Sequence, residues 1–348
     1  MRVLFAGGGT GGHLYPAIAL AEVLESRGDI PIFVTGDRSV EDRAFRASSW
    51  LRFAIHAAGL TTGSVWRRLR GLLSQPFALW RAWRIVRRVR PDHIVATGGY
   101  VAFPVGLVAA LTRRQLVLVE PNAIPGRVGR ILARWAKGVI ALDPDRLHTP
   151  RARAVRAGIP VRRAFLHIER RQPDDQPVLL VVGGSQGARR LNETLPGLPS
   201  VVKCSTVIHV TGPGNLEAAR DAWSTHPDVN VELIEYADDM PALYARADLA
   251  IARAGAATIA ELGAARLPAI LVPYPFAADR HQDANAAKFV EWGGGCVVSE
   301  SDQFADELDQ ALKLWIGPDT RRAAIERLEG EKERFDPEAL LDVLEDVR

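Results

Sequence analysis

The 348-residue sequence has little cysteine, no long hydrophobic run and, over one long stretch, no acidic residue. Its two cysteines, Cys204 and Cys296, stand far apart without the spacing of metal ligands, which favours free thiols in a reducing compartment. No stretch of about 18 apolar residues occurs, and the first residues lack the apolar region of a signal peptide. We therefore expect a protein that does not cross a membrane.

Acidic residues are absent from Arg43 to Pro91, a segment that holds eleven arginines. Residues 1–160 contain 24 Lys and Arg against 10 Asp and Glu, whereas the remainder contains 20 against 31, so the formal net charge of +3 hides a basic first half. This asymmetry predicts an anionic partner for the first half: nucleic acid, phospholipid or a phosphorylated substrate. No recognition-helix or stacking-aromatic motif accompanies the charge, which disfavours nucleic acid.

Short runs rich in Val, Ile and Leu alternate with helical patterns, which indicates parallel sheets covered on both faces. The predicted strands lie in the runs RVLFAG, IPIFVTG, HIVATGG, QLVLVE, GVIAL, PVLLVVGG, STVIHVTG, VNVELIEY, LAIARAG and PAILVPY. They form two sets, so we predict an α/β protein of two doubly wound, Rossmann-like domains. The polar stretch 167–177 is predicted to be the linker, and the last residues a helix with Asp336 as its N-cap and Pro337 in its first turn.

A glycine turn follows the first predicted strand in LFAGGGTGGHLYPA, residues 4–17. Gly7, Gly9 and Gly12 have the spacing G-x-G-x-x-G, which lets a backbone approach a pyrophosphate at a helix N-terminus. His13 follows this turn, and its ordinary pKa of about 6.5 suits a general base, although a structural histidine is the alternative. With Asp37 at the end of the second strand, the turn taken alone also fits a nicotinamide-dependent oxidoreductase or a turn that binds nothing.

A second glycine turn, GGSQGARRLNE, offers the Ser185 hydroxyl and the Gln186 amide beside its backbone N–H groups. Two such turns in one chain suit a reaction between a phosphorylated donor and a phosphorylated acceptor. Further along, Thr258 and Glu261 fall in the first turns of a helix, where the Glu261 carboxylate can accept hydrogen bonds from a ribose diol or simply stabilise the helix start.

The strand after that helix is predicted to lead into a loop of polar residues suited to sugar hydroxyls, with an ordinary solvated loop as the alternative. These residues are Asp279, His281, Gln282 and Asn285. LDPDR, with Asp143 and Asp145, resembles a metal-binding D-x-D motif, but the intervening proline favours an ordinary turn.

Together these motifs resemble the MurG-type transferases of peptidoglycan synthesis. The resemblance covers nearly the whole chain in order: GGGTGGHLYPA, GGYVAFP, EPNAIPG, GIPVR, GGSQGARRLNE, EYADDMPALYARADLAIARAGAATIAE and LPAILVPYP…DRHQDANA. It implies the GT-B architecture, two Rossmann-like domains facing a cleft. Residues 1–162 would bind acceptor and membrane, residues 163–335 would bind the UDP-sugar, and a helix over 336–348 would pack back on the first domain.

The resemblance implies inverting transfer of N-acetylglucosamine from UDP-N-acetylglucosamine to undecaprenyl-pyrophosphoryl-N-acetylmuramoyl-pentapeptide (lipid I), giving lipid II. It implies a peripheral location at the cytoplasmic face of the plasma membrane, and neither a cofactor nor an obligatory metal. A sugar-nucleotide epimerase or a diacylglycerol glycosyltransferase is the alternative with the same fold. An oxidoreductase leaves the second glycine turn and Glu261 unexplained, and a catalytically silent nucleotide-binding protein is a further alternative.

By the same resemblance, His13 is the candidate catalytic base. The donor-binding residues that it implies are Asn122, Arg162, Ser185, Gln186, Tyr236, Ala237, Ala256, Ala257, Thr258, Glu261, His281 and Gln282. The residues implied for the acceptor pyrophosphate are Thr10, Gly11, Gly12, His13 and Tyr100. The chain departs from the family pattern at Pro121, Ile159 and Ala254, where Gln, Asn and Ser are usual.

The segment Val65–Arg90 is predicted to dock on an anionic membrane surface, because it holds eight arginines, three tryptophans and no acid. One helical stripe, formed by Leu79, Trp83, Val86 and Val89, is expected to face the core. The predicted exposed aromatic patch comprises Trp66, Leu72, Leu73, Phe77 and Trp80, with a basic rim of Arg67, Arg68, Arg81, Arg84 and Arg88.

Overall fold

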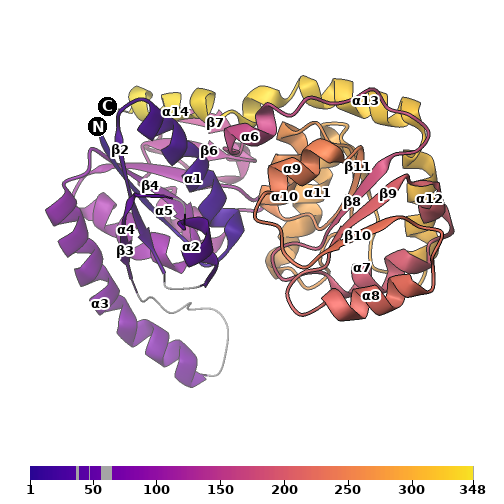
Figure 1. The fold of residues 1–348 in the computed structure, drawn as a ribbon. Helices are drawn as coiled ribbons and strands as arrows, with labels where there is room; N and C mark the ends of the chain where they lie inside the picture. The colour runs from indigo at the N-terminus through magenta and orange to yellow at the C-terminus, as the bar shows by residue number, and fades with distance from the viewer. Residues whose placement is uncertain (37–38, 47, 56–64, 348) are drawn as a thin grey trace. The chain divides into compact units, whose positions relative to one another are not determined.

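The computed structural model describes residues 1–36, 39–46, 48–55 and 65–347 (Figure 1). Asp37 lies outside the described residues, and so do the side chains of Trp66, Arg67, Arg68, Leu72 and Leu73. The chain divides into two compact units, which are described separately. Unit 1 comprises Met1–Arg162 and Asp336–Arg348, and unit 2 comprises Arg163–Phe335.

Unit 1 contains a sheet of parallel strands in the order β3-β2-β1-β4-β5-β6-β7. The strands are β1 (Arg2–Gly7), β2 (Ile30–Thr35), β3 (Leu51–Ala54), β4 (His93–Gly98), β5 (Gln115–Glu120), β6 (Gly138–Ala141) and β7 (Ala154–Ala157). The helices are α1 (Gly11–Ser26), α2 (Ser39–Ala44), α3 (Val65–Val89), α4 (Gly99–Leu111), α5 (Arg127–Leu132) and α14 (Pro337–Asp346), with a 3₁₀ turn at Pro144–Arg146.

Helices cover both faces of this sheet, as the continuous apolar strands predict. Alternate residues of β1 belong to different cores: Leu4 and Ala6 pack in a cluster with α3 and α4, whereas Val3 and Phe5 pack with α1 and α14. The predicted cap of α14 is confirmed, since the Asp336 carboxylate accepts a hydrogen bond from the Glu338 N–H at 2.9 Å. No helix among the described residues is long and apolar enough to span a bilayer.

Unit 2 contains a second parallel sheet in the order β10-β9-β8-β11-β12-β13. The strands are β8 (Val178–Val182), β9 (Thr206–Val210), β10 (Val231–Ile234), β11 (Leu249–Ala252), β12 (Ala269–Leu271) and β13 (Gly295–Val297). The helices are α6 (Arg163–Leu166), α7 (Arg189–Thr194), α8 (Leu216–Ser224), α9 (Met240–Arg246), α10 (Ala256–Ala264), α11 (His281–Glu291), α12 (Phe304–Trp315) and α13 (Pro318–Glu329), with short 3₁₀ helices at Leu195–Gly197, Pro199–Lys203, Ala278–Arg280 and Lys332–Phe335. Each unit is thus a doubly wound parallel sheet, as predicted.

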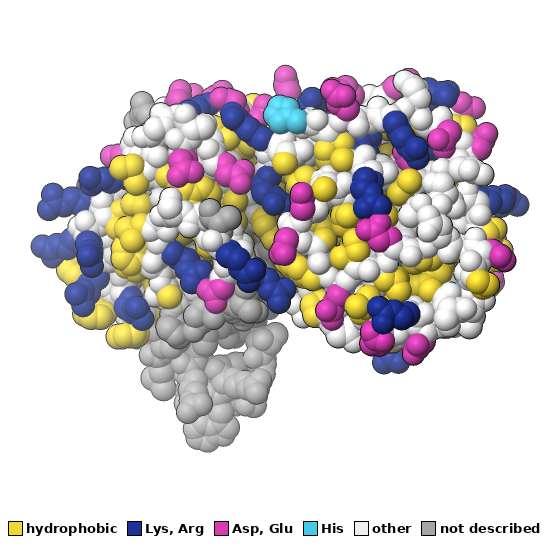
Figure 2. Space-filling view, viewed as in Figure 1, with side chains coloured by type: hydrophobic (Ala, Val, Ile, Leu, Met, Phe, Trp, Pro, Cys, Tyr) yellow, Lys and Arg dark blue, Asp and Glu magenta, His cyan; other side chains and the backbone are white. Residues whose placement is uncertain are grey.

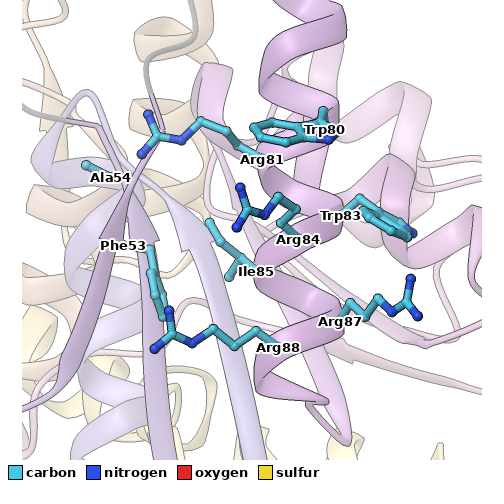
Figure 3. Close-up of a pocket in the computed structure, with 9 residues that line it drawn as sticks. All are labelled: Phe53, Ala54, Trp80, Arg81, Trp83, Arg84, Ile85, Arg87 and Arg88. Atoms are coloured by element: carbon cyan, nitrogen blue, oxygen red, sulfur yellow. The ribbon is translucent and has the colours of Figure 1, made fainter.

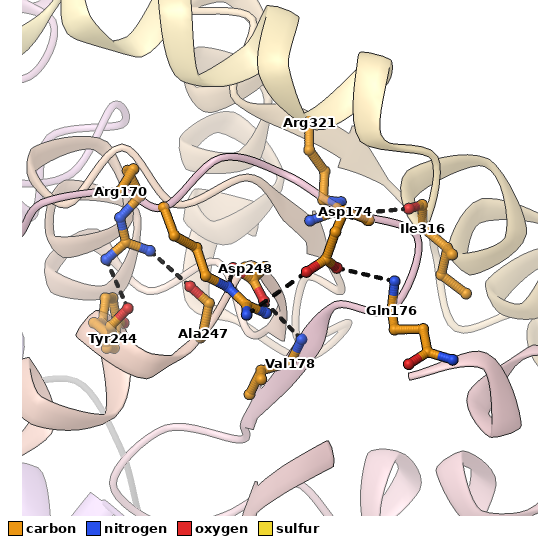
Figure 4. Close-up of polar contacts among 10 residues, drawn as sticks. Arg170, Asp174, Gln176, Val178, Tyr244, Ala247, Asp248, Ile316 and Arg321 are labelled. Carbon is orange, nitrogen blue, oxygen red and sulfur yellow. Dashed lines mark hydrogen bonds and ion pairs between the residues drawn. The ribbon is translucent and has the colours of Figure 1, made fainter. Parts of the chain in front are cut away.

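The prediction that residues 167–177 link the domains is wrong, because this stretch is bound to unit 2 along its length (Figure 4). The Arg170 guanidinium donates to the carbonyl oxygens of Tyr244 and Ala247, at 2.7 Å each. Arg171 forms an ion pair with the buried Asp248 carboxylate, which also accepts the Val178 N–H at 2.8 Å. The polar composition that suggests a linker instead serves hydrogen bonds, and the units divide between Arg162 and Arg163.

Candidate functional site

In unit 1 the first glycine turn lies where the strand order reverses, between β1 and β4. Ligands of open parallel sheets bind at the carboxyl ends of the strands at such a point. The register between the two strands shifts between Ala6 and Gly7, so that Gly7 pairs with Gly98 and the ladder is irregular at the turn. A side chain at Gly7 would collide with the Thr97 hydroxyl, which explains why glycine is needed there.

His13 lies in the first turn of α1, and its ring packs against the backbone that follows β4. A Cβ atom placed on Gly98 would lie 2.6 Å from His13 Nδ1, and Gly98 has φ +100°, a conformation that favours glycine. Thr10 stands at the N-cap position of α1, extended and exposed and without a capping hydrogen bond from its side chain, and Gly11 and Gly12 form the helix start beside it. The structure therefore brings His13 and the N–H groups of the α1 start to one sheet edge.

Glu41, which no sequence pattern indicated, also lies at this glycine turn. Its carboxylate is fully buried and accepts the N–H of Gly9 at 2.8 Å and of Gly36 at 3.2 Å. Tyr100 flanks the same place, because a Cβ on Gly36 would lie 2.6 Å from the Tyr100 hydroxyl and 3.1 Å from both Glu41 oxygens. Since Glu41 uses the Gly9 N–H, an anion at this turn depends on the N–H groups at the α1 start.

Asn122 follows β5 and is held by a second buried acid, Glu120. The Glu120 carboxylate accepts from the Asn122 backbone N–H at 3.2 Å, from its side-chain amide at 3.4 Å and from the Gly126 N–H at 3.0 Å. Burial raises the pKa of Glu120, against hydrogen bonds that lower it. Arg162, the last residue of this stretch of unit 1, stacks on Tyr15 of α1, with Cζ 5.1 Å from the ring centroid.

Unit 2 repeats the arrangement at its own reversal of strand order, between β8 and β11. The second glycine turn follows β8, and the side chains of Ser185 and Gln186 are exposed on it. The start of α10 follows β11, with Ala256, Ala257 and Thr258 in its first turn and Glu261 on its second, half-buried. The predicted phosphate and ribose residues thus share one edge of the sheet.

The sugar-loop prediction is partly wrong, because His281, Gln282 and Asn285 belong to helix α11 and only Asp279 lies in the preceding turn. Asn285 is fully buried and donates to the Ala254 carbonyl at 3.1 Å, so it braces the segment between β11 and α10. Gln282 accepts the Tyr274 N–H at 2.8 Å, and His281 Nδ1 lies 2.7 Å from the Ala278 carbonyl oxygen. Both side chains remain partly accessible at the end of β12.

Arg253, at the end of β11, is a buried cation that the patterns did not single out. It pairs with Glu300 at 2.6 Å, donates to the Val272 carbonyl at 3.1 Å and stacks on Tyr274 at 5.5 Å. Arg253 therefore holds the β12 exit, which carries Tyr274, against β11.

Two further predicted features lie away from the strand reversals. Tyr236 and Ala237 follow the edge strand β10 in unit 2, and both are half-buried. Asp143 accepts Arg146 Nε at 2.9 Å across the 3₁₀ turn Pro144–Arg146, so LDPDR forms the ordinary turn that its proline favours.

Helix α3 carries an exposed aromatic and basic surface in its described part (Figure 2). Phe77 and Trp80 are 55% and 48% exposed, as predicted, whereas the expectation that Trp83 faces the core is wrong, because it is 40% exposed. The other predicted members of the stripe face the core: Val86 and Val89 are buried and Leu79 packs against them partly buried. Ala78, Ala82 and Ile85 complete the core face of α3, which leaves Trp83 outside it.

A hollow of about 480 Å³ lies between α3 and the edge strand β3. Its lining residues are Phe53, Ala54, Trp80, Arg81, Trp83, Arg84, Ile85, Arg87 and Arg88 (Figure 3). Arg84 and Arg87 stack on Trp80 and Trp83 at 4.8 and 5.1 Å. No carboxylate of a described residue pairs with the four lining arginines, so this surface carries uncompensated positive charge beside exposed rings.

Comparisons with known proteins agree with this arrangement. The glycosyltransferase family 28 N-terminal domain matches residues 3–141, and the C-terminal domain of the same family matches residues 178–335. A UDP-N-acetylglucosamine–N-acetylmuramyl-(pentapeptide) pyrophosphoryl-undecaprenol N-acetylglucosamine transferase from Alkalilimnicola ehrlichii is 40% identical over 92% of this chain and 91% of its own length. An enzyme of the same name from an Anaeromyxobacter species is 38% identical over 95% of this chain and 89% of its own.

Among solved structures, the crystal structure of Acinetobacter baumannii MurG superposes with a TM-score of 0.78 at 27% sequence identity. That alignment covers 99% of this chain and 97% of the other.

Proposed function

Because this chain belongs to glycosyltransferase family 28, we propose that it transfers N-acetylglucosamine from UDP-N-acetylglucosamine to a pyrophosphoryl-undecaprenol-linked N-acetylmuramyl-pentapeptide (lipid I). The observation that carries this function is the match of both family domains together with relatives of one name over nearly the whole chain. A sugar-nucleotide epimerase or a diacylglycerol glycosyltransferase is disfavoured, because the relatives at 38–40% identity carry the transferase name.

The donor is proposed to bind at the strand reversal of unit 2. The backbone and side chains of Ser185 and Gln186, with the N–H groups at the start of α10, suit the pyrophosphate because each presents donors to an anion. Glu261 suits the ribose diol, and His281 and Gln282 suit the sugar. Arg162, Tyr236 and Ala237 for uracil, and Asn122 for the sugar, are retained as predictions.

The acceptor pyrophosphate is proposed to bind at the start of α1, at Thr10, Gly11 and Gly12, with Tyr100 nearby. His13 in the same turn would take the proton of the attacking hydroxyl as UDP leaves the anomeric carbon from the opposite side. Donors aimed at the diphosphate would stabilise the charge that develops on the leaving group, through groups that the chain itself supplies.

A transfer assay tests this function directly. Purified protein, radiolabelled UDP-N-acetylglucosamine and a lipid I analogue should give a labelled lipid product and free UDP in equal amounts. Release of UDP without a labelled lipid, or epimerisation of the sugar, would contradict the proposed reaction.

Replacing Glu261 by alanine should weaken the binding of UDP and of UDP-N-acetylglucosamine alike, since the ribose belongs to both. Loss of charge-assisted hydrogen bonds costs about 1.5–3 kcal/mol, or roughly tenfold or more in Kd. Calorimetry with UDP measures the change, and Glu326→Ala, an exposed acid on α13 of the same unit, is the matched control. Equal affinities for the two variants would leave Glu261 as a helix-stabilising carboxylate.

We further propose that unit 1 docks peripherally on an anionic membrane at its cytoplasmic face. The basic, aromatic surface of α3 supports this, because tryptophan favours the membrane interface and each basic residue near anionic lipid contributes about 1 kcal/mol. The proposed acceptor is linked to a lipid, so attraction to the membrane surface would hold unit 1 close to its acceptor.

The variant Trp80→Ala/Arg81→Ala/Arg84→Ala should co-sediment less with vesicles of anionic lipid than the unmodified protein. Binding of the unmodified protein should require anionic lipid and weaken as salt rises, because the attraction is electrostatic. Leu314→Ala/Arg220→Ala/Arg322→Ala removes an exposed apolar side chain and two arginines from unit 2 and should bind normally. Equal binding to neutral and anionic vesicles would contradict the proposal and indicate that α3 is an ordinary solvated helix.

A further inference from the structure

A chain of buried hydrogen bonds crosses unit 2 behind the second glycine turn. Trp223 Nε1–H of α8 donates to His209 Nδ1 of β9 at 3.1 Å, and His209 Nε2 lies 2.9 Å from the Asn192 side-chain oxygen of α7. Asn192 in turn donates its Nδ2 to the Thr211 carbonyl oxygen at 2.9 Å. All four residues are buried.

Which atom donates and which accepts in each of these hydrogen bonds follows from the chemistry of the groups. An indole N–H only donates, so His209 Nδ1 must accept, and the ring proton must then be on Nε2. That proton points at the Asn192 oxygen, which turns the Asn192 amide nitrogen toward Thr211. Burial lowers the pKa of His209 to about 4, so the ring stays neutral at physiological pH and keeps this tautomer.

Thr211, the last residue of this hydrogen-bond chain, contacts the second glycine turn. A side chain at Gly187 would collide with the Thr211 carbonyl oxygen, and a side chain at Gly212 would collide with the Gly187 backbone. Both glycines have left-handed φ angles, +74° and +85°. The turn that presents Ser185 and Gln186 therefore lies backbone to backbone on the turn that Thr211 begins, while Asn192 belongs to the helix that the glycine turn starts.

We propose that Trp223, His209 and Asn192 are positioning residues for donor binding, holding the second glycine turn in the conformation that receives the donor pyrophosphate. The proposal rests on the proposed function, because it takes this turn to be the pyrophosphate site. Apolar side chains could fill the same core, but they would not fix the distance between α7 and Thr211. A fully satisfied polar chain specifies one geometry, which a preorganised anion site requires.

Calorimetry with UDP tests the proposal. Trp223→Phe removes the N–H donor to His209 together with part of a buried ring, and the imidazole can then change tautomer, so UDP affinity should fall about tenfold. Trp315→Phe, a buried tryptophan of the same core on α12, is the matched control and should bind UDP normally. In turnover assays Trp223→Phe should raise the KM for UDP-N-acetylglucosamine more than it lowers kcat, because it disturbs a binding site.

A double-mutant cycle separates this role from general destabilisation. Asn192→Asp places a carboxylate oxygen against the Thr211 carbonyl and should also weaken UDP binding about tenfold. Because both residues act through one chain, the double variant should lose little more than either single variant. Multiplicative losses, or an equal loss in Trp315→Phe, would overturn the proposal.

Nitrogen-15 chemical shifts of the His209 ring give a readout that needs no ligand. The unmodified protein should have a proton on Nε2 and none on Nδ1, and Trp223→Phe should disturb this state. The opposite tautomer in the unmodified protein would overturn the inference. If the expected tautomer is seen but the unmodified protein does not bind UDP, both the donor-positioning role and the proposed function fail, while the hydrogen-bond chain itself stands.

Discussion

Replacing His13 by alanine is expected to lower kcat by about 10²–10⁴-fold while the Kd for UDP stays the same. A general base acts on the hydroxyl proton as the bond to the sugar forms, so its loss raises the barrier without weakening ground-state binding. The position of His13 supports this role, because it stands in the first turn of α1 with its ring against Gly98, at the reversal of strand order. Single-turnover assays with saturating donor and acceptor measure the effect.

The matched control for this variant is His148→Ala, which removes an exposed histidine from the same unit. It should keep the kcat of the unmodified protein. Unchanged turnover in His13→Ala would identify His13 as a structural residue and require another base. A loss of UDP affinity in His13→Ala equal to its loss of turnover would contradict a base that acts only in the transition state.

Replacing Gly98 by alanine should lower kcat about a hundredfold without changing UDP affinity. The added Cβ would lie 2.6 Å from His13 Nδ1, and alanine at φ +100° is strained, so the ring must move. Displacement of a reacting group by about 1 Å is enough to cost about 10² in rate. The donor site proposed on unit 2 is unaffected by this change, so calorimetry with UDP separates the two effects.

Gly28→Ala is the matched control, because Gly28 also has a left-handed φ, +81°, but has open space where its Cβ would be. Both variants place alanine at a positive φ, which strains the backbone, and only Gly98→Ala also displaces His13. Equal turnover in the two variants would mean that the position of the His13 ring does not limit the reaction.

The interior of each sheet could be predicted from the sequence, whereas most of the edges could not. The ten apolar runs correspond to strands, but β3, β7 and β13 went unpredicted. All three are edge strands of three or four residues, LRFA, AVRA and GCV, and many of their side chains are partly or fully exposed. An edge strand needs no continuous apolar run, because solvent replaces one neighbour, and so it leaves little signal in the pattern.

Some residues of the candidate site could be predicted from the sequence, and others could not. Glycine turns have a local spacing, so both could be found, along with the helix starts that follow them. Glu41 and Arg253 were missed, because they bind a backbone N–H or a charge from a distant segment, and no spacing in the sequence reports such contacts. Glu120 was missed although its partners, Asn122 and Gly126, follow it closely, because an acid at the end of a strand does not by itself indicate which N–H groups it accepts. The sequence likewise did not reveal that Asn285, placed in a polar loop suited to sugar hydroxyls or to solvent, donates to the Ala254 carbonyl, 31 residues earlier in the chain.

Unit 1 is formed by two separate segments of the sequence, Met1–Arg162 and Asp336–Arg348, so its second segment is synthesised after unit 2. Helix α14 packs on α1, β6 and β7, and its side chains Leu340, Leu341, Val343 and Leu344, with Val347 directly after it, are buried in the same cluster as α1. Those side chains are translated only after the whole of unit 2, which is one continuous segment that ends at Phe335. Unit 1 is therefore completed only after the segment of unit 2 has been synthesised, and until α14 docks, the apolar face that α1, β6 and β7 present to it stays uncovered.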